Sequence, residues 1–317
     1  MRAAYATTAL DPDDPLSALA VGELPEPVPP DGWEVVEVRA GSLNHHELWS
    51  LRGVGLPAAR LPMVLGCDAA GLDADGNEVV IYPVVEDKGD PRGFSLLSEH
   101  FPGTLAERVA VPRENLVPKP AGLSFLDAAC LPTAWLTAYH MLTTRGRVEQ
   151  GSSVLVQGAG GGVATAAVAL AVALGKRVYA TSRDPAKREK IAALGATAVE
   201  PGARLPERVD VVIESVGAAT FEHSMKCGAP GARIVVCGAT GGYLATVDLR
   251  RLFMMQLDIL GSTMGTREEL IALLDLCATR DIRPVIDSTY GFTAVADAFG
   301  RLASGEIFGK VAVDFLH

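Results

Sequence analysis

The sequence lacks the features that mark several large classes of protein. Its net charge is −10, with 28 Lys and Arg against 38 Asp and Glu, which disfavours a general nucleic-acid binder because such proteins are normally basic. No apolar run reaches the roughly 18 residues that a membrane span needs. The opening MRAAYATTAL has neither the charged nor the apolar region of a secretory signal. We therefore expect a cytoplasmic protein with no nucleic-acid or membrane partner.

Cysteine is scarce, and its spacing excludes the common cysteine frameworks. There are 5 cysteines, an odd number, and none forms a CxxC pair. They are scattered at Cys67, Cys130, Cys227, Cys237 and Cys277. This pattern favours reduced thiols in a cytoplasmic enzyme. With 317 residues, of which 49% are hydrophobic and 21% charged, the chain is long enough for two globular domains.

What the sequence does contain is a strand, a glycine-rich turn and a helix in unbroken order over 153–174, SVLVQGAGGGVATAAVALAVAL. Small residues let backbone N–H groups at a helix N-terminus approach a pyrophosphate, and the helix dipole favours negative charge there. The strand before the turn and the helix after it are the context that this motif requires. We predict a dinucleotide site at Gly158, Gly160, Gly161, Gly162 and Val163. A glycine turn without a ligand is the alternative.

The residues after the next strand indicate which dinucleotide binds. The strand Arg177–Thr181 ends about 20 residues after the glycine turn, where an NAD-binding protein places an acid on the ribose. Ser182 and Arg183 hold that place here, and Lys187 follows in the next helix, 185–194, for which Asp184 is the predicted N-cap. A hydroxyl and a guanidinium suit a 2′-phosphate, so the sequence predicts NADPH. That Arg183 and Lys187 are only solvated surface charges remains the alternative.

The two parts of the chain differ in their patterning. Short strands at 33–40, 79–84 and 105–111, separated by turns, are typical of a compact β-rich domain. From about residue 123 a helix over 124–142, with Ser124 and Asp127 as its capping box, is followed by alternating strands and helices that include a strand over 209–214. This alternation favours an α/β fold with a doubly wound parallel sheet. We predict a β-rich domain over 1–122 and 266–317, and a dinucleotide-binding domain over 123–265.

Several further motifs accompany the glycine turn in this order: Gly41–Trp49, Leu65–Gly71, Glu214–Gly217, Val236–Thr240, Leu260–Thr266 and Phe308–Lys310. Together they give a chain that resembles the medium-chain dehydrogenase/reductase superfamily over essentially its whole length. Within it the chain is most similar to the zinc-independent quinone oxidoreductase and alkenal reductase branch. The resemblance implies a GroES-like catalytic domain, a Rossmann cofactor domain and a homodimer.

The resemblance also locates the positions where zinc-dependent relatives hold their metal. These positions match Asn44, Cys67 and a residue near Thr133. Asn and Thr are poor ligands for zinc, which prefers thiolate, imidazole or carboxylate. The structural-zinc lobe would follow Tyr82, and residues 83–110 contain no cysteine. The sequence therefore predicts no metal, with a residual site from Cys67, Asp68 and His45 or His46 as the alternative.

The same resemblance assigns the remaining site residues. It places His46 where relatives keep a proton relay and His45 where many keep a pyrophosphate contact; Asn44 could donate to a substrate carbonyl, and Tyr82 and Trp49 are expected to line the pocket. A histidine that is only packed or exposed is the competing interpretation of His46. The implied cofactor contacts come from Thr137, Gly238, Ala239, Thr240, Ser262, Thr263, Met264 and Lys310.

Without a Lewis acid, the accessible chemistry is reduction of a conjugated acceptor, because conjugation spreads the developing negative charge. We therefore expect a reductase that transfers hydride from NADPH to a quinone or an α,β-unsaturated carbonyl. The alternatives are an alcohol dehydrogenase with an atypical zinc site, and an NADPH-binding protein with little catalysis. Fold analogy does not separate these alternatives, because function resides in the site.

Overall fold

The computed structural model describes residues 1–8, 13–149 and 152–316. The chain forms two compact units. Unit 1 comprises Met1–Thr133 and Leu270–His317, and unit 2 comprises Ala134–Glu269. These divisions fall later in the chain than the predicted domain limits at 122 and 265, and the assignment of domains stays a prediction. No helix in the described ranges is both long and apolar enough to cross a membrane.

Unit 2 is built on one parallel sheet whose strand order is β13-β12-β11-β14-β15-β16. The order reverses at β11, which is the arrangement of a Rossmann dinucleotide-binding sheet. The strands are β11 (Ser153–Val156), β12 (Arg177–Thr181), β13 (Thr197–Val199), β14 (Val209–Glu214), β15 (Gly228–Val236) and β16 (Asp258–Gly261). The predicted fold class is confirmed, and the predicted strands 177–181 and 209–214 match residue for residue.

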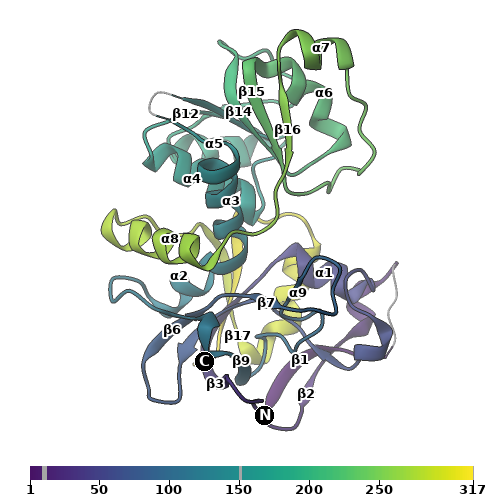
Figure 1. Cartoon of the computed structure of the whole chain (residues 1–317), viewed down its shortest axis with the longest axis vertical. Helices are drawn as coiled ribbons and strands as arrows, with labels where there is room; N and C mark the ends of the chain where they lie inside the picture. Colours follow the sequence, from purple (N-terminus) through teal and green to yellow (C-terminus); the bar gives the residue numbers. More distant parts are fainter. Residues whose placement is uncertain (9–12, 150–151, 317) are drawn as a thin grey trace. The chain divides into compact units, whose positions relative to one another are not determined.

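Helices connect these strands and cover the sheet, as Figure 1 shows for α4, α5 and α6. They are α3 (Leu136–His140), α4 (Gly162–Ala173), α5 (Pro185–Ala193), α6 (Ala218–Cys227) and α7 (Leu249–Met254). Phe221 and Met225 of α6 pack with Leu155, Val212 and Ile234 in one apolar cluster. Because strand residues alternate between faces, Val154 and Val156 point to the opposite face, and α4 contacts β11 and β12.

One predicted element differs from the structure. The pattern predicts a single helix over 124–142, whereas the structure has α2 (Phe125–Ala129), a π-helical turn η4 (Leu131–Trp135), α3, and a second π-helical turn η5 (Met141–Arg145). Pro132 lies in the first π-helical turn and has no N–H to continue the α-helical hydrogen bonds, so a wider turn is accommodated there. The predicted Ser124 cap is present, since the Ser124 hydroxyl accepts from the Asp127 N–H.

Unit 1 is mostly β-structure. Its main sheet has the order β10-β6-β5-β3-β18-β17, with β9 paired to the first half of the long strand β3, and two small sheets flank it, β2-β1-β4 and β7-β8. The strands are β1 (Arg2–Ala6), β2 (Leu19–Glu23), β3 (Trp33–Leu43), β4 (Met63–Val64), β5 (Asp68–Leu72), β6 (Glu78–Ile81), β7 (Val84–Glu86), β8 (Phe94–Leu96), β9 (Arg108–Pro112), β10 (Leu116–Pro118), β17 (Ile286–Gly291) and β18 (Lys310–Asp314).

Few helices accompany these strands in unit 1. They are α1 (His45–Leu51), α2 and α9 (Val295–Ala303), with short 3₁₀ turns at Pro15–Ala18, Ala58–Arg60, Arg113–Asn115 and Phe292–Ala294. The helix α8 (Arg267–Thr279) begins in unit 2 and continues into unit 1. Leu48 and Leu51 of α1 and Val295, Phe299 and Leu302 of α9 pack in one apolar cluster.

The register of β3 decides which side chains meet in unit 1. Its second half pairs antiparallel with β5, placing Ser42 opposite Asp68, and with β18, placing Leu43 opposite Val311. The residues just beyond these pairs, Asn44 and Lys310, therefore emerge side by side. The predicted return of the C-terminal tail is thus an additional strand of the main sheet in unit 1.

Candidate functional site

The glycine turn of unit 2 leaves backbone donors available. Gly158 has φ +66°, and a Cβ there would lie 2.4 Å from a methyl of Val216, so both conformation and space require glycine. Gly161 is the N-cap of α4 and provides no side-chain cap. Within the described ranges, the N–H groups of Gly160–Val163 have no intramolecular acceptor. These donors, at the positive end of a helix, form a cradle for a pyrophosphate.

A buried polar network beneath the turn fixes its position. The Glu214 carboxylate accepts from the Ser224 hydroxyl at 2.6 Å, so Ser224 in turn accepts from the Gln157 amide at 3.0 Å. The Gln157 amide oxygen accepts from Thr181 Oγ1 at 2.8 Å, and Thr181 Oγ1 in turn accepts from the Gly158 N–H at 2.9 Å. An acid at the end of β14 therefore determines the direction of every hydrogen bond up to the glycine turn.

His223 completes this network from α6. Gln157 Nε2 donates to His223 Nδ1 at 2.9 Å, so the ring proton lies on Nε2, which donates to the Ala203 carbonyl at 2.9 Å. The sequence assigned no role to His223, because nothing in its neighbourhood along the chain indicates Gln157 as a partner.

The predicted 2′-phosphate residues lie beside the turn. The Ala159 N–H donates to the Thr181 carbonyl at 2.8 Å, which holds the glycine turn against the end of β12. Ser182 is buried there, and its hydroxyl accepts from the Asp184 N–H at 3.3 Å. Arg183 is exposed, and its guanidinium has no partner among the described residues. Asp184 caps α5 as predicted, accepting from the Ala186 N–H, and Lys187 lies in the first turns of that helix.

The other predicted cofactor residues of unit 2 follow β15 and β16. Gly238, Ala239 and Thr240 leave the end of β15, and the Thr240 N–H donates to the Ser215 carbonyl. Ser262, Thr263 and Met264 leave the end of β16, where the Thr137 hydroxyl lies 3.8 Å from the Met264 sulfur. The Ser262 hydroxyl is buried and has no partner in the described structure. Each of these residues either follows the carboxyl end of a parallel strand or contacts a residue that does. Open α/β sheets bind their ligands at these carboxyl ends.

In unit 1, a first buried cluster gathers around Lys310. Its ammonium lies 2.8 Å from the Leu43 carbonyl, 2.5 Å from Asn44 Oδ1 and 3.0 Å from Asp68 Oδ2, and the side chain is 2% exposed. Asp68 Oδ2 also accepts from Asn44 Nδ2 and Ser42 Oγ. The sequence had placed Lys310 toward the cofactor. The structure uses its three donors on unit 1 groups, and that predicted contact stays a prediction.

Asn44 also begins α1 and so orients the next side chains. Its N–H donates to Glu47 Oε2 at 2.6 Å, and the two residues form a capping box. This box fixes His45, His46 and Glu47 in the first helical turn. Glu47 is fully buried, whereas His45 faces solvent.

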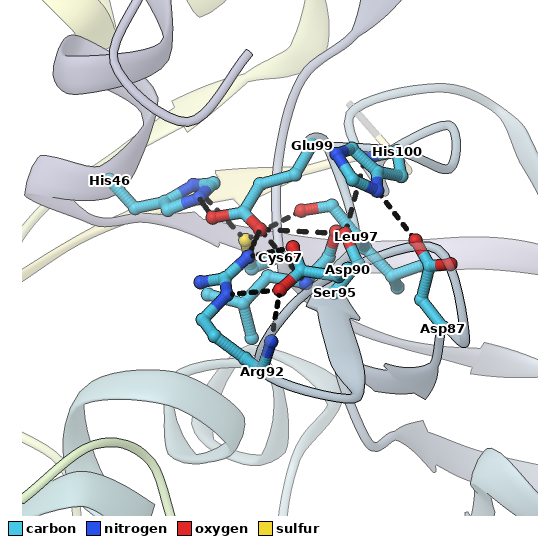
Figure 2. A network of polar contacts seen from close by, with 10 residues as sticks. His46, Cys67, Asp87, Asp90, Arg92, Ser95, Leu97, Glu99 and His100 are labelled. Carbon is cyan, nitrogen blue, oxygen red and sulfur yellow. Dashed lines mark hydrogen bonds and ion pairs between the residues drawn. The ribbon is translucent and has the colours of Figure 1, made fainter. Parts of the chain in front are cut away.

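His46 belongs to a second cluster, which Figure 2 shows together with its neighbours. Its Nδ1 lies 3.3 Å from the Cys67 sulfur, and its Nε2 lies 3.3 Å from Glu99 Oε1. The other Glu99 oxygen accepts from Arg92 Nη2 at 2.7 Å, and the Cys67 thiol donates to the Leu97 carbonyl at 3.1 Å. A chain of polar contacts therefore runs from a buried thiol through an imidazole and a carboxylate to a guanidinium.

The protonation of this chain follows from its contacts. Burial raises the pKa of the Cys67 thiol to about 12, so it stays protonated. Burial also disfavours a charged His46 ring, but contacts with Cys67, Glu47 and Glu99 raise its pKa well above the usual value. Burial would likewise raise the pKa of Glu99, but hydrogen bonds from His46 and Arg92 lower it to about 2. His46 is accordingly an imidazolium that donates from both ring nitrogens.

The predicted catalytic residues do not all lie in the same part of unit 1. Asn44 and His46 lie in the two adjoining clusters, whereas Tyr82 follows β6, half-buried, with its backbone paired to Asn115. Trp49 lies in α1 with the Arg52 guanidinium over its ring. Sequence reasoning missed Glu99 and Arg92, which come from a loop without a motif. Their only signal is a carboxylate next to His100 in SEH.

Zinc at the position implied by the resemblance would need ligands from Asn44, Cys67 and Thr133. The Asn44 amide is bonded at both ends, and the Asp68 carboxylate beside it is already paired with the Lys310 ammonium. The residues present at that position do not fit a zinc ion.

Comparisons with known proteins show which families and solved structures this chain resembles. The profile of the family described as zinc-binding dehydrogenase matches residues 162–279. The crystal structure of an NAD-dependent alcohol dehydrogenase is 34% identical, with TM-score 0.88 and coverage of 99% of both chains. The 2-octenoyl-CoA carboxylase reductase CinF, solved with NADP and 2-octenoyl-CoA, is 26% identical, with TM-score 0.89 and coverage of 99% of this chain and 87% of that one.

A curated relative agrees with these structures. Crotonyl-CoA reductase of Streptomyces collinus is 27% identical over 95% of this chain and 82% of its own length. Three findings lead to the same assignment. They are the strand order of unit 2, the glycine turn before α4, and similarity over nearly the whole chain to a dehydrogenase and to reductases. The chain therefore belongs to the medium-chain dehydrogenase/reductase superfamily and is an NAD(P)-dependent oxidoreductase.

Proposed function

We propose that this chain is an NADPH-dependent reductase that transfers hydride to an α,β-unsaturated carbonyl compound or a quinone without a catalytic metal. The observation that carries the proposal is the Lys310–Asp68–Asn44 cluster, in which an ammonium is bonded to Asn44, the side chain at one of the positions implied for a metal ligand. A conjugated acceptor needs no Lewis acid there, because its developing charge is delocalised and hydrogen-bond donors suffice to stabilise it.

The cofactor groups of this proposal come from unit 2. A bound NADPH would supply the hydride. The free N–H groups of Gly160–Val163 bind the pyrophosphate, and the unpartnered Arg183 guanidinium pairs with the 2′-phosphate beside Ser182. The network from Glu214 to Thr181 holds the turn rigid, so binding does not have to order it.

The catalytic groups come from unit 1. His46 holds two ring protons and is 17% exposed, so in this proposal it gives one proton to the reduced acceptor. Asn44 Nδ2 carries a second hydrogen beyond the one donated to Asp68, and this hydrogen is directed to the substrate carbonyl. Lys310 fixes Asn44 in that orientation and is a positioning residue. Tyr82 remains a proposed pocket residue.

Two of the relatives favour an unsaturated thioester or enone over a quinone. One was solved with 2-octenoyl-CoA and the other is a crotonyl-CoA reductase, and both names specify an acyl group with a conjugated double bond. The 34% identical alcohol dehydrogenase supports the second candidate, an alcohol dehydrogenase with an atypical zinc site. The two candidates differ in substrate and in their requirement for metal.

The deciding experiment follows NADPH oxidation by chelator-treated protein with enones, enoyl thioesters, quinones and ketones. We expect turnover with the conjugated acceptors and no loss of rate after chelation. Alcohol oxidation that disappears on chelation and returns with zinc would instead establish the second candidate. Tight NADPH binding with no turnover on any acceptor would leave an NADPH-binding protein with little catalysis.

Arg183→Ala tests the cofactor assignment. Removing a hydrogen-bonded charge costs about 1.5–3 kcal/mol, so NADPH should bind about 10–100-fold more weakly. NADH, which has no 2′-phosphate, should bind nearly as before. Arg204→Ala, at another exposed arginine of unit 2, is the matched control. Equal losses for both cofactors in Arg183→Ala would mean that Arg183 does not bind the 2′-phosphate.

We further propose a homodimer formed through β16, an edge strand of the unit 2 sheet. Large apolar side chains lie exposed on and before it: Leu249, Phe253, Met254 and Ile259. An edge strand flanked by such a patch is a favourable place for a second copy to pair. Sedimentation of the wild type and of Phe253→Lys measures this, with a dimer expected for the first and a monomer for the second.

A further inference from the structure

Three metal-ligating atoms converge in unit 1, in the cluster that adjoins the one around Lys310. They belong to His46, Glu47 and Cys67, and all lie within 4.8 Å of one another. Imidazole, carboxylate and thiolate together are a donor set typical of Zn²⁺ and related thiophilic divalent cations. Cys67 is one of the three positions implied for the family site, whereas His46 and Glu47 are not.

Glu47 gives the independent evidence that this cluster has room for a ligand. Its Oε2 is used by the Asn44 N–H, but its Oε1 is buried without a hydrogen-bond partner in the described structure. That oxygen lies 3.9 Å from His46 Nδ1, and the Glu47 side chain is fully buried. A buried carboxylate oxygen without a donor is costly, so an atom that would satisfy it is the natural occupant.

The surroundings of His46 are those of a metal-binding histidine. Figure 2 shows both Glu99 and Cys67 next to the His46 ring, with a dashed line from the ring to each. A ligating histidine usually donates its second ring N–H to a carboxylate, which fixes the ring and its tautomer. Here Nε2 lies 3.3 Å from Glu99, and Arg92 holds Glu99 in place at 2.7 Å. Nδ1 is then left for the metal, toward Cys67 and Glu47.

We propose that His46 Nδ1, Glu47 Oε1 and Cys67 Sγ bind one thiophilic divalent cation, with water as a further ligand. This site goes beyond the proposed reductase function and would inhibit it, because a cation on Nδ1 removes the imidazolium that the proposed reductase uses as its proton donor. On binding, Cys67 loses its thiol proton and its bond to the Leu97 carbonyl, and His46 loses the proton on Nδ1. About two protons therefore pass to the solvent for each cation bound, and no oxidation or reduction occurs.

Cobalt titration of the chelator-stripped protein tests the site, because Co²⁺ reports its ligands by absorption. We expect one Co²⁺ per chain, an intense thiolate-to-metal charge-transfer band, and release of about two protons near neutral pH. Zn²⁺ should displace the cobalt and remove the band. Cys67→Ser should abolish the band, whereas Cys277→Ser, at another buried free thiol of unit 1, should keep it.

Two further variants make the result independent of Cys67→Ser folding. Glu47→Gln keeps an oxygen for the Asn44 N–H, and we expect it to weaken cobalt binding while leaving the circular dichroism unchanged. Glu99→Gln should weaken binding about 10–100-fold, as expected for a residue that orients a ligand. The absence of a charge-transfer band in the wild type, or a band that survives Cys67→Ser, would overturn the proposal.

Discussion

Two buried polar networks, one in each unit, differ in how completely their atoms are paired. The network of unit 2 runs from Glu214 through Ser224, Gln157 and Thr181 to Gly158, and every polar side-chain atom in it has a partner. In unit 1, buried oxygens lack a hydrogen-bond partner within the described structure: Glu47 Oε1, Asp68 Oδ1, Ser50 Oγ, Ser98 Oγ and Thr133 Oγ1.

This difference distinguishes a network that holds the backbone in place from one that can also bind a ligand or a proton. A fully paired network rigidifies a segment and offers nothing further to a ligand, which suits the base of a cofactor turn. A network with unpaired buried acceptors has capacity for a proton, a cation or a substrate group. The comparison therefore identifies unit 1 as the part where variants should alter protonation and ligand binding as well as stability.

The largest effect is expected at the buried ion pair of unit 1. Lys310→Met leaves the Asp68 carboxylate buried and uncompensated, which should lower the free energy of unfolding by about 3–5 kcal/mol in chemical denaturation. Adding Asp68→Leu should recover much of the loss, because the isolated charge disappears. Lys226→Met, at an exposed pair with Glu222, is the control and should cause no measurable change. A small effect of Lys310→Met alone would mean that water reaches Asp68.

The next largest effect depends on pH. The raised pKa of His46 gives stability that is fully present below about 6.5, its usual unfolded value, and is lost as pH rises through the folded value. The pKa of Glu99, lowered to about 2, gives stability that is present above about 4.3 and is lost as pH falls toward 2. Glu99→Gln should therefore cost about 1.5–3 kcal/mol near pH 5.5 and less at a second pH above the folded pKa of His46.

Denaturation of this variant at the two pH values measures the difference. Glu86→Gln, at an exposed carboxylate in β7, should show no such pH dependence. If the cost of Glu99→Gln is the same at both pH values, His46 is not the imidazolium that the contacts imply.

A smaller effect is expected in the complete network of unit 2. Thr181→Val keeps the shape of the side chain but leaves Gly158 N–H and Gln157 Oε1 unpaired, which should cost about 1–2 kcal/mol in the free energy of unfolding. NADPH should also bind more weakly, because the glycine turn is less rigid, and calorimetry measures both quantities. Unchanged stability would show that this network is less important than its completeness suggests.

The smallest effect on stability is expected at a buried side chain whose removal breaks no hydrogen bond. Ser50→Ala removes a buried hydroxyl that has no partner in the described part of unit 1, so stability should change by less than about 0.5 kcal/mol. A loss as large as that of Thr181→Val would show that Ser50 binds an ordered water, and the contrast between the two networks would then weaken.

Much of unit 2 could be predicted from the sequence because its signals are local. The glycine turn, the strands 177–181 and 209–214 and the cap at Asp184 each depend on residues within one strand–turn–helix unit. The hydrogen bonds of Gln157 could not be predicted, because its partners Thr181 and Ser224 are 24 and 67 residues away along the chain.

In unit 1, the sequence by itself determined which residue types replace the metal ligands at 44 and 67, and so which chemistry is disfavoured there. Only the tertiary structure decided which side chain pairs with Asn44 and Asp68 and which side chains surround His46. Lys310 reaches Asn44 through the register of β18 on β3, and Glu99 reaches His46 from a loop without a motif. Strand register and loop packing are set by the burial of many distant side chains together, so no short stretch of sequence encodes them.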